Sequence, residues 1–288
     1  MSGRVMYHHP DNDRLSVNYV TFDLSEAEQR LSELGDNKIG EIEEYDLSET
    51  VYVVYKGYEV PDITDDIEYN IHDEVAEIAK NDQIITTRVL KIFESIADEK
   101  YEEENEKLAA YKEIEIEKIP GALDRVTWGE SVAETGGELL SCLILRHALP
   151  NANHRTSLGM LSLYYQAISS SFEMPATATE DYDWEGWVNA FIEDSKKLLT
   201  VRRNVPRFRY LYDAGCTVIE RKDGLRVHLE EYDLTMGHWD AMEKYAEEHK
   251  HRSVEFAQDV LDKAGTPELR HGDPLSKSDF ADELQTME

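Results

Sequence analysis

The residues best suited to chemistry lie in one short stretch, HALPNANHRTSL, at positions 147–158. Two histidines, two asparagines and an arginine interrupt sequence that is apolar and helical in pattern on both sides. A histidine, with an ordinary pKa of about 6.5, can accept a proton near neutral pH. An arginine offers planar N–H donors that suit phosphate oxygens. The stretch therefore combines a general base with an anion-binding group.

Two helices must position these side chains, one ending and one beginning within the stretch. The first is expected to start at Ser131, which has Glu134 at capping-box spacing, and to run to about Arg146. Pro150 cannot continue it, because proline lacks the N–H and clashes with the preceding turn. The second is expected to begin near 151–153, since asparagine is a favoured N-cap. The sequence thus predicts a helix, a tight turn and a new helix N-terminus.

A helix N-terminus suits an anion, because its N–H groups point outward and its dipole is positive there. Arg155 lies in the predicted first turn and His147 ends the preceding helix, so both can face the same opening. A plainer interpretation is that Pro-Asn-Ala-Asn only stops one helix and caps the next, with both residues at a helix junction. The helix–turn–helix pattern alone leaves both interpretations open.

The stretch resembles the active-site motif of the Fic/Doc superfamily, usually written H-x-F-x-[D/E]-G-N-G-R-x-x-R. ANHRTSL is similar to the Ala-Asn-x-Arg-Thr-x-Leu form of the Doc-like branch. His147, Asn153 and Arg155 have the mutual spacing of the motif. Leu149 replaces the buried aromatic residue, and Leu158 replaces the final arginine, which the Doc-like branch commonly lacks.

This resemblance implies a helical core that binds ATP or another nucleoside triphosphate as a substrate. Family members transfer AMP, or the terminal phosphate in Doc-like members, to a Ser, Thr or Tyr hydroxyl of a target protein. His147 would be the catalytic general base, with the Asn153 side chain shaping the anion hole. The implied anion hole for the nucleotide phosphates comprises Asn151, Ala152, Asn153, His154 and Arg155. As for Doc-like toxins, an antitoxin-like inhibitor is a possible second partner.

The position of the family's magnesium ligand departs from the pattern. An Asp or Glu is expected there, and this chain has Asn151. Mg²⁺ prefers anionic oxygen ligands, and an amide oxygen is neutral. Nucleotide phosphates and water could still hold Mg²⁺ beside Asn151. The alternative is a non-catalytic nucleotide-binding regulatory module on the same fold, and a helical adaptor with no small-molecule site is a third.

Two further family features have candidates in the sequence. TVYVVYKGYEV at 50–60 and IPGALDRV at 119–126 both suit the flap that pins a target segment as an added strand. SELGDN at 32–37 matches the inhibitory pattern [S/T]-x-x-x-E-[G/N] imperfectly, with Asp36 in place of Glu.

The composition limits the classes of partner. The chain has 288 residues, 41% of them hydrophobic, and 61 acidic against 30 basic residues give a net charge of -31. Such a field repels nucleic-acid phosphates and anionic lipid, which argues against both as partners. It suits the cytoplasm of a salt-accumulating organism, where salt screens the self-repulsion. No window approaches a membrane span, so a soluble cytoplasmic protein is expected.

We expect a mainly α fold: a Fic-like helical bundle with a short N-terminal α/β segment and a C-terminal β-hairpin plus helix. The pair Asp223-Gly224 between two alternating runs predicts that hairpin. The polar stretch 102–117 is interpreted as a solvated helix. Neither His8 and His9 nor His249 and His251 have partner ligands at metal-binding spacing. The expected parts are an N-terminal segment with a possible flap strand at 1–62, a Fic/Doc-like helical domain at 63–210, a hairpin-plus-helix appendage at 211–265 and a disordered tail at 266–288.

Overall fold

The computed structural model describes residues 3–59, 75, 78–179 and 183–287. The chain is mainly helical with a smaller β component, as the sequence predicts. It forms two compact units, each made of two separate pieces of the chain. Unit 1 comprises Met1–Val60 and Glu193–Glu247, and unit 2 comprises Pro61–Ile192 and Glu248–Glu288. Two long helices, α7 (Gly186–Asp213) and α8 (His238–Lys263), contribute residues to both units.

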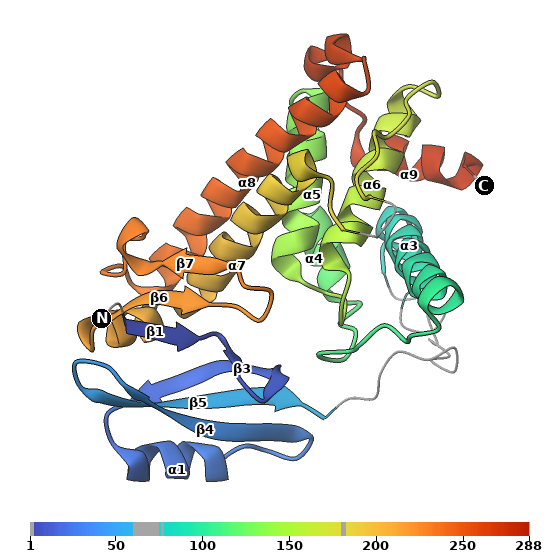
Figure 1. The fold of residues 1–288 in the computed structure, drawn as a ribbon. Coiled ribbons are helices and arrows are strands. Elements are labelled where there is room, and N and C mark those ends of the chain that lie inside the picture. Colours follow the sequence, from blue (N-terminus) through green and yellow to red (C-terminus); the bar gives the residue numbers. More distant parts are fainter. Residues whose placement is uncertain (1–2, 60–74, 76–77, 180–182, 288) are drawn as a thin grey trace. The chain divides into compact units, whose positions relative to one another are not determined.

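Unit 1 holds the β structure of the chain. One sheet has the strand order β2-β3-β5-β4, and the other has the order β1-β6-β7. Figure 1 shows helix α1 along one face of the four-stranded sheet. The elements of unit 1 are β1 (Gly3–Met6), β2 (His8–His9), β3 (Asn12–Thr21), α1 (Leu24–Ser32), β4 (Lys38–Asp46), β5 (Thr50–Tyr58), β6 (Cys216–Glu220), β7 (Arg226–His228) and η1 (Leu229–Glu231).

The core of unit 1 is apolar and includes side chains from both sheets and from α7. Val53 and Tyr55 of β5, Phe208 of α7 and Ile219 of β6 are all fully buried. Their β-branched and aromatic side chains suit a pleated surface that is covered by other elements. Burial of this apolar surface is the main stabilising term of the unit.

Arginines of α7 bind backbone carbonyls of unit 1. Arg202 donates to the Met242 carbonyl at 2.7 Å, and Arg209 donates to the carbonyls of Leu234 and Met236 at 2.5 and 2.6 Å. A guanidinium has several donors in one plane, so a single side chain can bond two carbonyls. These basic residues therefore hold the ends of neighbouring segments in place.

Unit 2 is helical in the part that the structure describes. The predicted capping box opens α5, with Ser131 and Glu134 bonding each other's backbone N–H groups. The helices α5 and α8 approach closely, since a Cβ on Gly137 would lie 2.5 Å from the Val254 Cα. The elements of unit 2 are α3 (Lys80–Glu104), α4 (Lys118–Leu123), α5 (Val132–Arg146), α6 (Asn153–Ile168), η2 (Pro267–His271) and α9 (Lys277–Thr286).

The tail predicted to be disordered at 266–288 is instead largely ordered. It forms η2 and α9, and Phe280 of α9 is fully buried. Its ring lies 5.3 Å from that of Tyr164 and 6.0 Å from that of Trp128, between ring centroids. The prediction was wrong because Phe280, Ala281 and Leu284 of α9 are buried, although the segment as a whole is polar.

The structure can also be compared with the predicted hairpin, the predicted polar helix and the predicted boundaries between the parts of the chain. The hairpin about Asp223-Gly224 is confirmed, since β6 pairs antiparallel with β7 and Gly224 has φ 76°. The helix predicted over 102–117 is wrong beyond Glu104, where α3 ends, and Asn105 caps α3 in the left-handed conformation. Unit 2 starts at position 61, close to the predicted boundary, but residues 193–210 belong to unit 1 and the predicted appendage 211–265 is divided.

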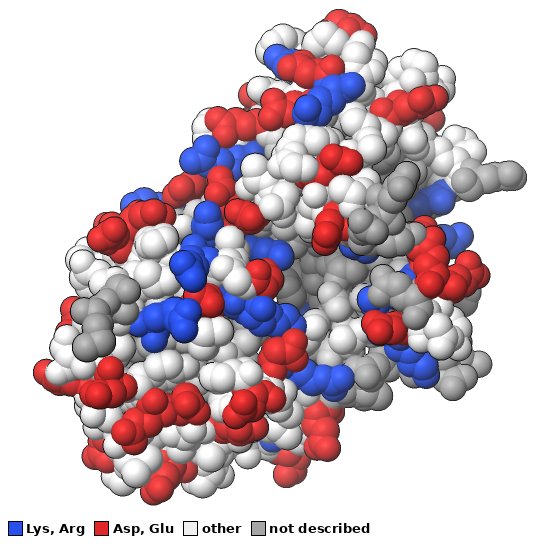
Figure 2. Space-filling model, viewed as in Figure 1, with Lys and Arg blue, Asp and Glu red and all other residues white. Residues whose placement is uncertain are grey.

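The surface charge and the hydropathy of the helices are as the acidic, polar composition of the chain predicts. Figure 2 shows acidic side chains spread over the face in view, with Lys and Arg side chains gathered around the β6–β7 hairpin. Among the helices of the described residues, none combines the length and the apolar character needed to cross a membrane.

Candidate functional site

The motif stretch 147–158 forms the predicted helix, turn and helix. Helix α5 ends at Arg146, and His147 caps it in the left-handed conformation with φ 50°. Helix α6 begins at Asn153, and Ala152 before it also has a positive φ, 52°. Positive φ is uncommon for residues other than glycine. The prediction that an asparagine caps α6 was wrong, because Ala152 occupies the N-cap and no side chain caps the helix.

The Asn153 side chain closes the turn. Its Oδ1 accepts the Leu149 N–H at 3.1 Å, and its Nδ2 donates to the carbonyls of Leu149 at 2.9 Å and Asn151 at 3.3 Å. The residue is buried, and both amide hydrogens are used within the turn. Asn153 therefore shapes the N-terminus of α6.

The Asn151 side chain is also used inside the protein. Its Oδ1 accepts the Ala152 N–H at 2.7 Å, and its Nδ2 donates to the Ala109 carbonyl at 2.8 Å. Both ends of the amide thus have partners. An aspartate at this position has no N–H donor, so the hydrogen bond to the Ala109 carbonyl would be lost. The contact to Ala109 accounts physically for an amide at a position where the resemblance implies a carboxylate.

Segment 109–115 runs antiparallel to the motif turn. Tyr111 N–H donates to the Pro150 carbonyl at 3.3 Å, and Glu115 N–H donates to the Ala148 carbonyl at 2.9 Å. The Lys112 ammonium bonds the His147 carbonyl at the C-terminus of α5. A cation at that helix end is favourable. These bonds hold the polar segment 109–115 beside the motif turn, a position that its composition does not predict.

Neither flap candidate offers a free strand edge. Residues 50–58 form β5, which is bonded to β3 and β4 on its two sides. Residues 119–123 belong to α4. The inhibitory-motif candidate at 32–37 covers the end of α1 and the turn after it. In the described part of the chain, 109–115 is the segment that the backbone bonds place beside the motif.

Arg155 lies in the first turn of α6, and its guanidinium carbon is 5.4 Å from the centre of the Trp184 ring. Trp184 forms an isolated bridge with Ala178. The flanking bonds from Thr179 N–H to Asp183 and from Glu185 N–H to Thr177 measure 2.8 and 3.0 Å. A guanidinium over an aromatic face keeps its charge and part of its hydration. The sequence favours Trp184 as a core residue, and no pattern links it to Arg155, which lies 29 positions earlier (184 against 155).

One protein-family model matches the whole chain, residues 1–288, and its description reads "Family of unknown function (DUF8172)". The chain belongs to this family. No curated protein and no solved structure matches it. The DUF8172 match covers both units, so residues of both belong to one family pattern.

In the described residues of the DUF8172 chain, no group of three or more His, Cys, Asp or Glu side chains could hold a metal ion. His249 is fully buried, with Nδ1 bonded to the Ser141 hydroxyl at 2.7 Å. Asn151 has no anionic oxygen, and its amide oxygen already accepts a bond. These residues do not fit Mg²⁺ as a ligand set.

Proposed function

We propose that the chain is a Fic/Doc-like transferase that moves part of a nucleoside triphosphate to a hydroxyl of a target protein. His147 is the general base, and the N-terminus of α6 at Asn153, His154 and Arg155 receives the phosphates. The spacing of His147, Asn153 and Arg155, which resembles the Fic/Doc motif, supports this proposal. ATP is the first substrate to test.

In the proposed step, His147 takes the proton of a Ser, Thr or Tyr hydroxyl as its oxygen attacks phosphorus. Attack at the α-phosphorus forms a phosphodiester with AMP and releases pyrophosphate. Attack at the γ-phosphorus forms a phosphomonoester and releases ADP. A positioned base contributes typically ~10²–10⁴-fold to such a step. Arg155 and the first-turn N–H groups stabilise the negative charge on the transferred group.

The observation that carries the proposal is the turn closed by Asn153. That closure puts His147 at one end of a short connection and the first turn of α6 at the other. Because Asn153 is buried and bonded on both sides of its amide, the connection has one defined shape. A preorganised anion site is the kind that stabilises a transition state. Arg155 beside Trp184 keeps a cation at that site.

The test uses the purified full chain in high salt with ATP labelled at either the α- or the γ-phosphate. An extract of a salt-adapted organism supplies target proteins, with Mg²⁺ in one arm and a chelator in the other. We expect label on protein from the α-position for AMP transfer, or from the γ-position alone for phosphate transfer. His147→Ala should lower transfer by at least ~10²-fold. The control His251→Ala changes a histidine that is 71% exposed on α8, and it should leave transfer unchanged.

Transfer of the same rate in His147→Ala would overturn the mechanism. The second candidate is a nucleotide-binding module without transfer activity, and the engaged amide of Asn151 favours it. It predicts ATP binding that Arg155→Gln weakens, with no label on protein from either position. Absence of ATP binding to the wild-type chain would contradict both candidates.

A further inference from the structure

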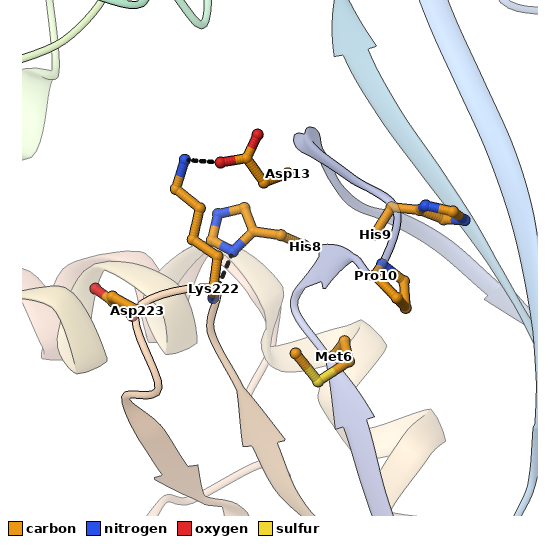
Figure 3. Close-up of a pocket in the computed structure, with 7 residues that line it drawn as sticks. All are labelled: Met6, His8, His9, Pro10, Asp13, Lys222 and Asp223. Carbon is orange, nitrogen blue, oxygen red and sulfur yellow. Dashed lines mark hydrogen bonds and ion pairs between the residues drawn. The ribbon is translucent and has the colours of Figure 1, made fainter.

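A cavity of about 510 Å³ opens in unit 1 where the chain passes from one sheet to the other. Strand β1 ends at Met6 in the three-stranded sheet, and β2 begins at His8 in the four-stranded sheet. The turn of the β6–β7 hairpin forms the opposite wall (Figure 3). Its volume lies within the range of small-molecule sites. The cavity is lined by Met6, His8, His9, Pro10, Asp13, Lys222 and Asp223.

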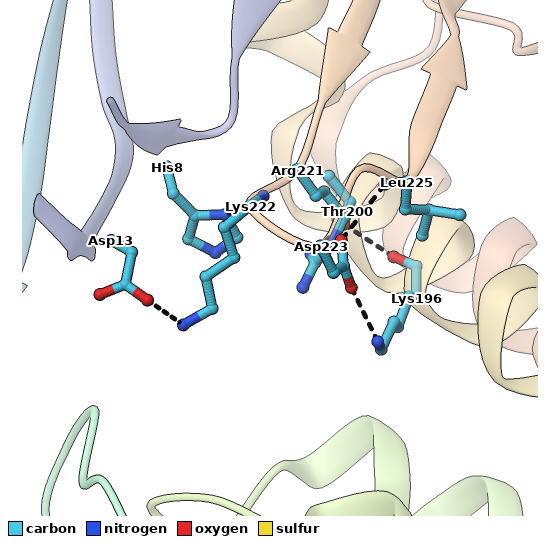
Figure 4. Close-up of polar contacts among 8 residues, drawn as sticks. All are labelled: His8, Asp13, Lys196, Thr200, Arg221, Lys222, Asp223 and Leu225. Atoms are coloured by element: carbon cyan, nitrogen blue, oxygen red, sulfur yellow. Dashed lines mark hydrogen bonds and ion pairs between the residues drawn. The ribbon is translucent and has the colours of Figure 1, made fainter. Parts of the chain in front are cut away.

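The His8 ring presents one N–H group to this cavity. Its Nδ1 accepts the backbone N–H of Lys222 at 3.2 Å. In a neutral imidazole, the nitrogen that accepts has no hydrogen, so the hydrogen is on Nε2. Figures 3 and 4 show the second ring nitrogen turned toward the side chains of Lys222 and Asp13. His8 therefore acts there as a neutral donor and not as a base or a metal ligand.

Burial supports that protonation state. Burial, followed by the nearby charges of Arg221 and Lys222, lowers the pKa of His8 to about 3, although Asp223 and Asp13 act in the opposite direction. The ring is thus uncharged at neutral pH. The neighbouring His9 contacts a different group, since its Nε2 lies 3.3 Å from a Glu41 carboxylate oxygen.

The Lys222 ammonium lies beside the same space, paired with Asp13 at 2.8 Å. The Asp13 side chain is 57% exposed, and that of Lys222 is 29% exposed. Ion pairs with an exposed partner contribute little to stability, because water and salt compete with them. An anion from solution can therefore take the place of the Asp13 carboxylate at small cost.

The other charges around the cavity are arranged in a chain (Figure 4). Asp223 accepts from the Lys196 ammonium at 2.7 Å, and its second oxygen lies 3.7 Å from Arg221 Nε. Arg221 also donates to the Thr200 hydroxyl at 2.7 Å. Asp223 thus pairs with two cations, Lys196 and Arg221, and the Lys222 ammonium pairs with the exposed Asp13 carboxylate. These five side chains comprise three cations and two carboxylates, which is a local positive excess in a chain of net charge -31.

We propose that this cavity binds the oxyanion of a small molecule between the Lys222 ammonium and the His8 Nε2–H, with the Asp13 carboxylate displaced. The oxyanion is a phosphate or a carboxylate, because both accept from two converging donors. Met6 and Pro10 provide an apolar wall for the group that carries the oxyanion. The site lies in unit 1 and does not depend on the proposed transferase chemistry.

The test is calorimetric titration of the full chain with inorganic phosphate and, separately, with acetate. It uses the lowest NaCl concentration at which circular dichroism shows the protein folded. We expect saturable binding of at least one of the two anions, and the tighter one identifies the class of oxyanion. Lys222→Gln should weaken binding by about tenfold or more. Asp13→Asn, which removes the competing carboxylate, should tighten binding by roughly threefold to tenfold.

A matched control separates this site from a general charge effect and from the motif. Lys38→Gln removes one exposed lysine of unit 1 away from the cavity and should bind as the wild type does. Equal affinity of Lys222→Gln and wild type would overturn the proposal, as would no saturable binding of either anion. Binding that Arg155→Gln abolishes and Lys222→Gln retains would place the anion at the motif and would also overturn it.

Discussion

The Asn153 side chain forms a hydrogen-bonded ring with the backbone of Leu149, accepting its N–H at 3.1 Å and donating to its carbonyl at 2.9 Å. The two residues are four positions apart and both are buried. The ring holds the connection between α5 and α6 in one conformation. It therefore links the stability of unit 2 to the geometry of the candidate site.

We predict that Asn153→Asp destabilises unit 2. The substitution keeps the shape of the side chain but replaces the Nδ2 donor with an oxygen facing the carbonyls of Leu149 and Asn151. We expect the free energy of unfolding to fall by about 1–3 kcal/mol, the range for a buried polar group left without its partners. Urea unfolding followed by circular dichroism measures this. Asn105→Asp, at an exposed helix end, should change it by less than about 0.5 kcal/mol, and equal losses would contradict the argument.

Asn151→Asp should make the motif dependent on Mg²⁺. Without the metal, the variant loses the bond to the Ala109 carbonyl, which should lower the free energy of unfolding by about 1–2 kcal/mol. With Mg²⁺ and ATP, the new carboxylate supplies the anionic ligand that Asn151 lacks, so transfer should rise. Thermal unfolding with and without Mg²⁺, together with the labelled-ATP assay, checks both parts. An identical effect of Mg²⁺ on the variant and the wild type would remove the metal role of this position.

Phe280→Ala should strongly destabilise unit 2, although it lies near the C-terminus. The ring is fully buried against Tyr164 and Trp128, so its removal leaves a cavity. We expect a loss of about 3–5 kcal/mol in the free energy of unfolding. The comparison is Tyr101→Ala, whose side chain is 41% exposed and should cost much less. Limited proteolysis gives a second readout, and we expect the tail to be cut faster in Phe280→Ala than in the wild type. Equal rates of cleavage in these two proteins would mean that the tail is already disordered in the wild type.

The stability of unit 1 should depend on pH through His8. Its pKa, lowered to about 3 by burial and by Arg221 and Lys222 against the effect of Asp223 and Asp13, lies below the ordinary value. The unfolded chain therefore binds a proton that folded His8 does not, and stability falls as the pH drops from about 6.5 toward about 3.

The measurement is the urea midpoint at about pH 7 and at about pH 5. His8→Gln should lose less stability than the wild type between these two conditions, because it has no titrating ring. His251→Gln, on the surface of unit 2, should follow the wild type. A wild-type pH profile in His8→Gln would contradict the assignment of the lowered pKa to a neutral buried ring.

Elements that depend on neighbouring residues were predictable. The capping box at Ser131 and Glu134, the break at Pro150 and the turn at Gly224 each act within a few positions. Proline removes an N–H wherever it stands, and a glycine at positive φ needs no tertiary support. The mainly α fold, the helix–turn–helix at the motif and the β6–β7 hairpin followed from such local chemistry.

Contacts between distant segments were decided by the tertiary structure alone. The polar segment 109–115 is ordered by bonds to 148–150, and its own composition resembles a solvated helix. Trp184 reaches Arg155 because a local bridge holds its loop in place. His8 meets Lys222 only because β1 pairs in parallel with β6, more than 200 positions away along the chain.

The sequence by itself therefore determined the helix–turn–helix of the motif and the β6–β7 hairpin, and it indicated which residues of the motif could bind an anion. Only the tertiary structure decided which of those side chains are used inside the protein, as Asn151 and Asn153 are, and which donors face a cavity. The physical reason is that each donor or acceptor of a side chain bonds to whichever partner the packing brings to it. Residue type defines what a group can bind, and the fold decides what it does bind.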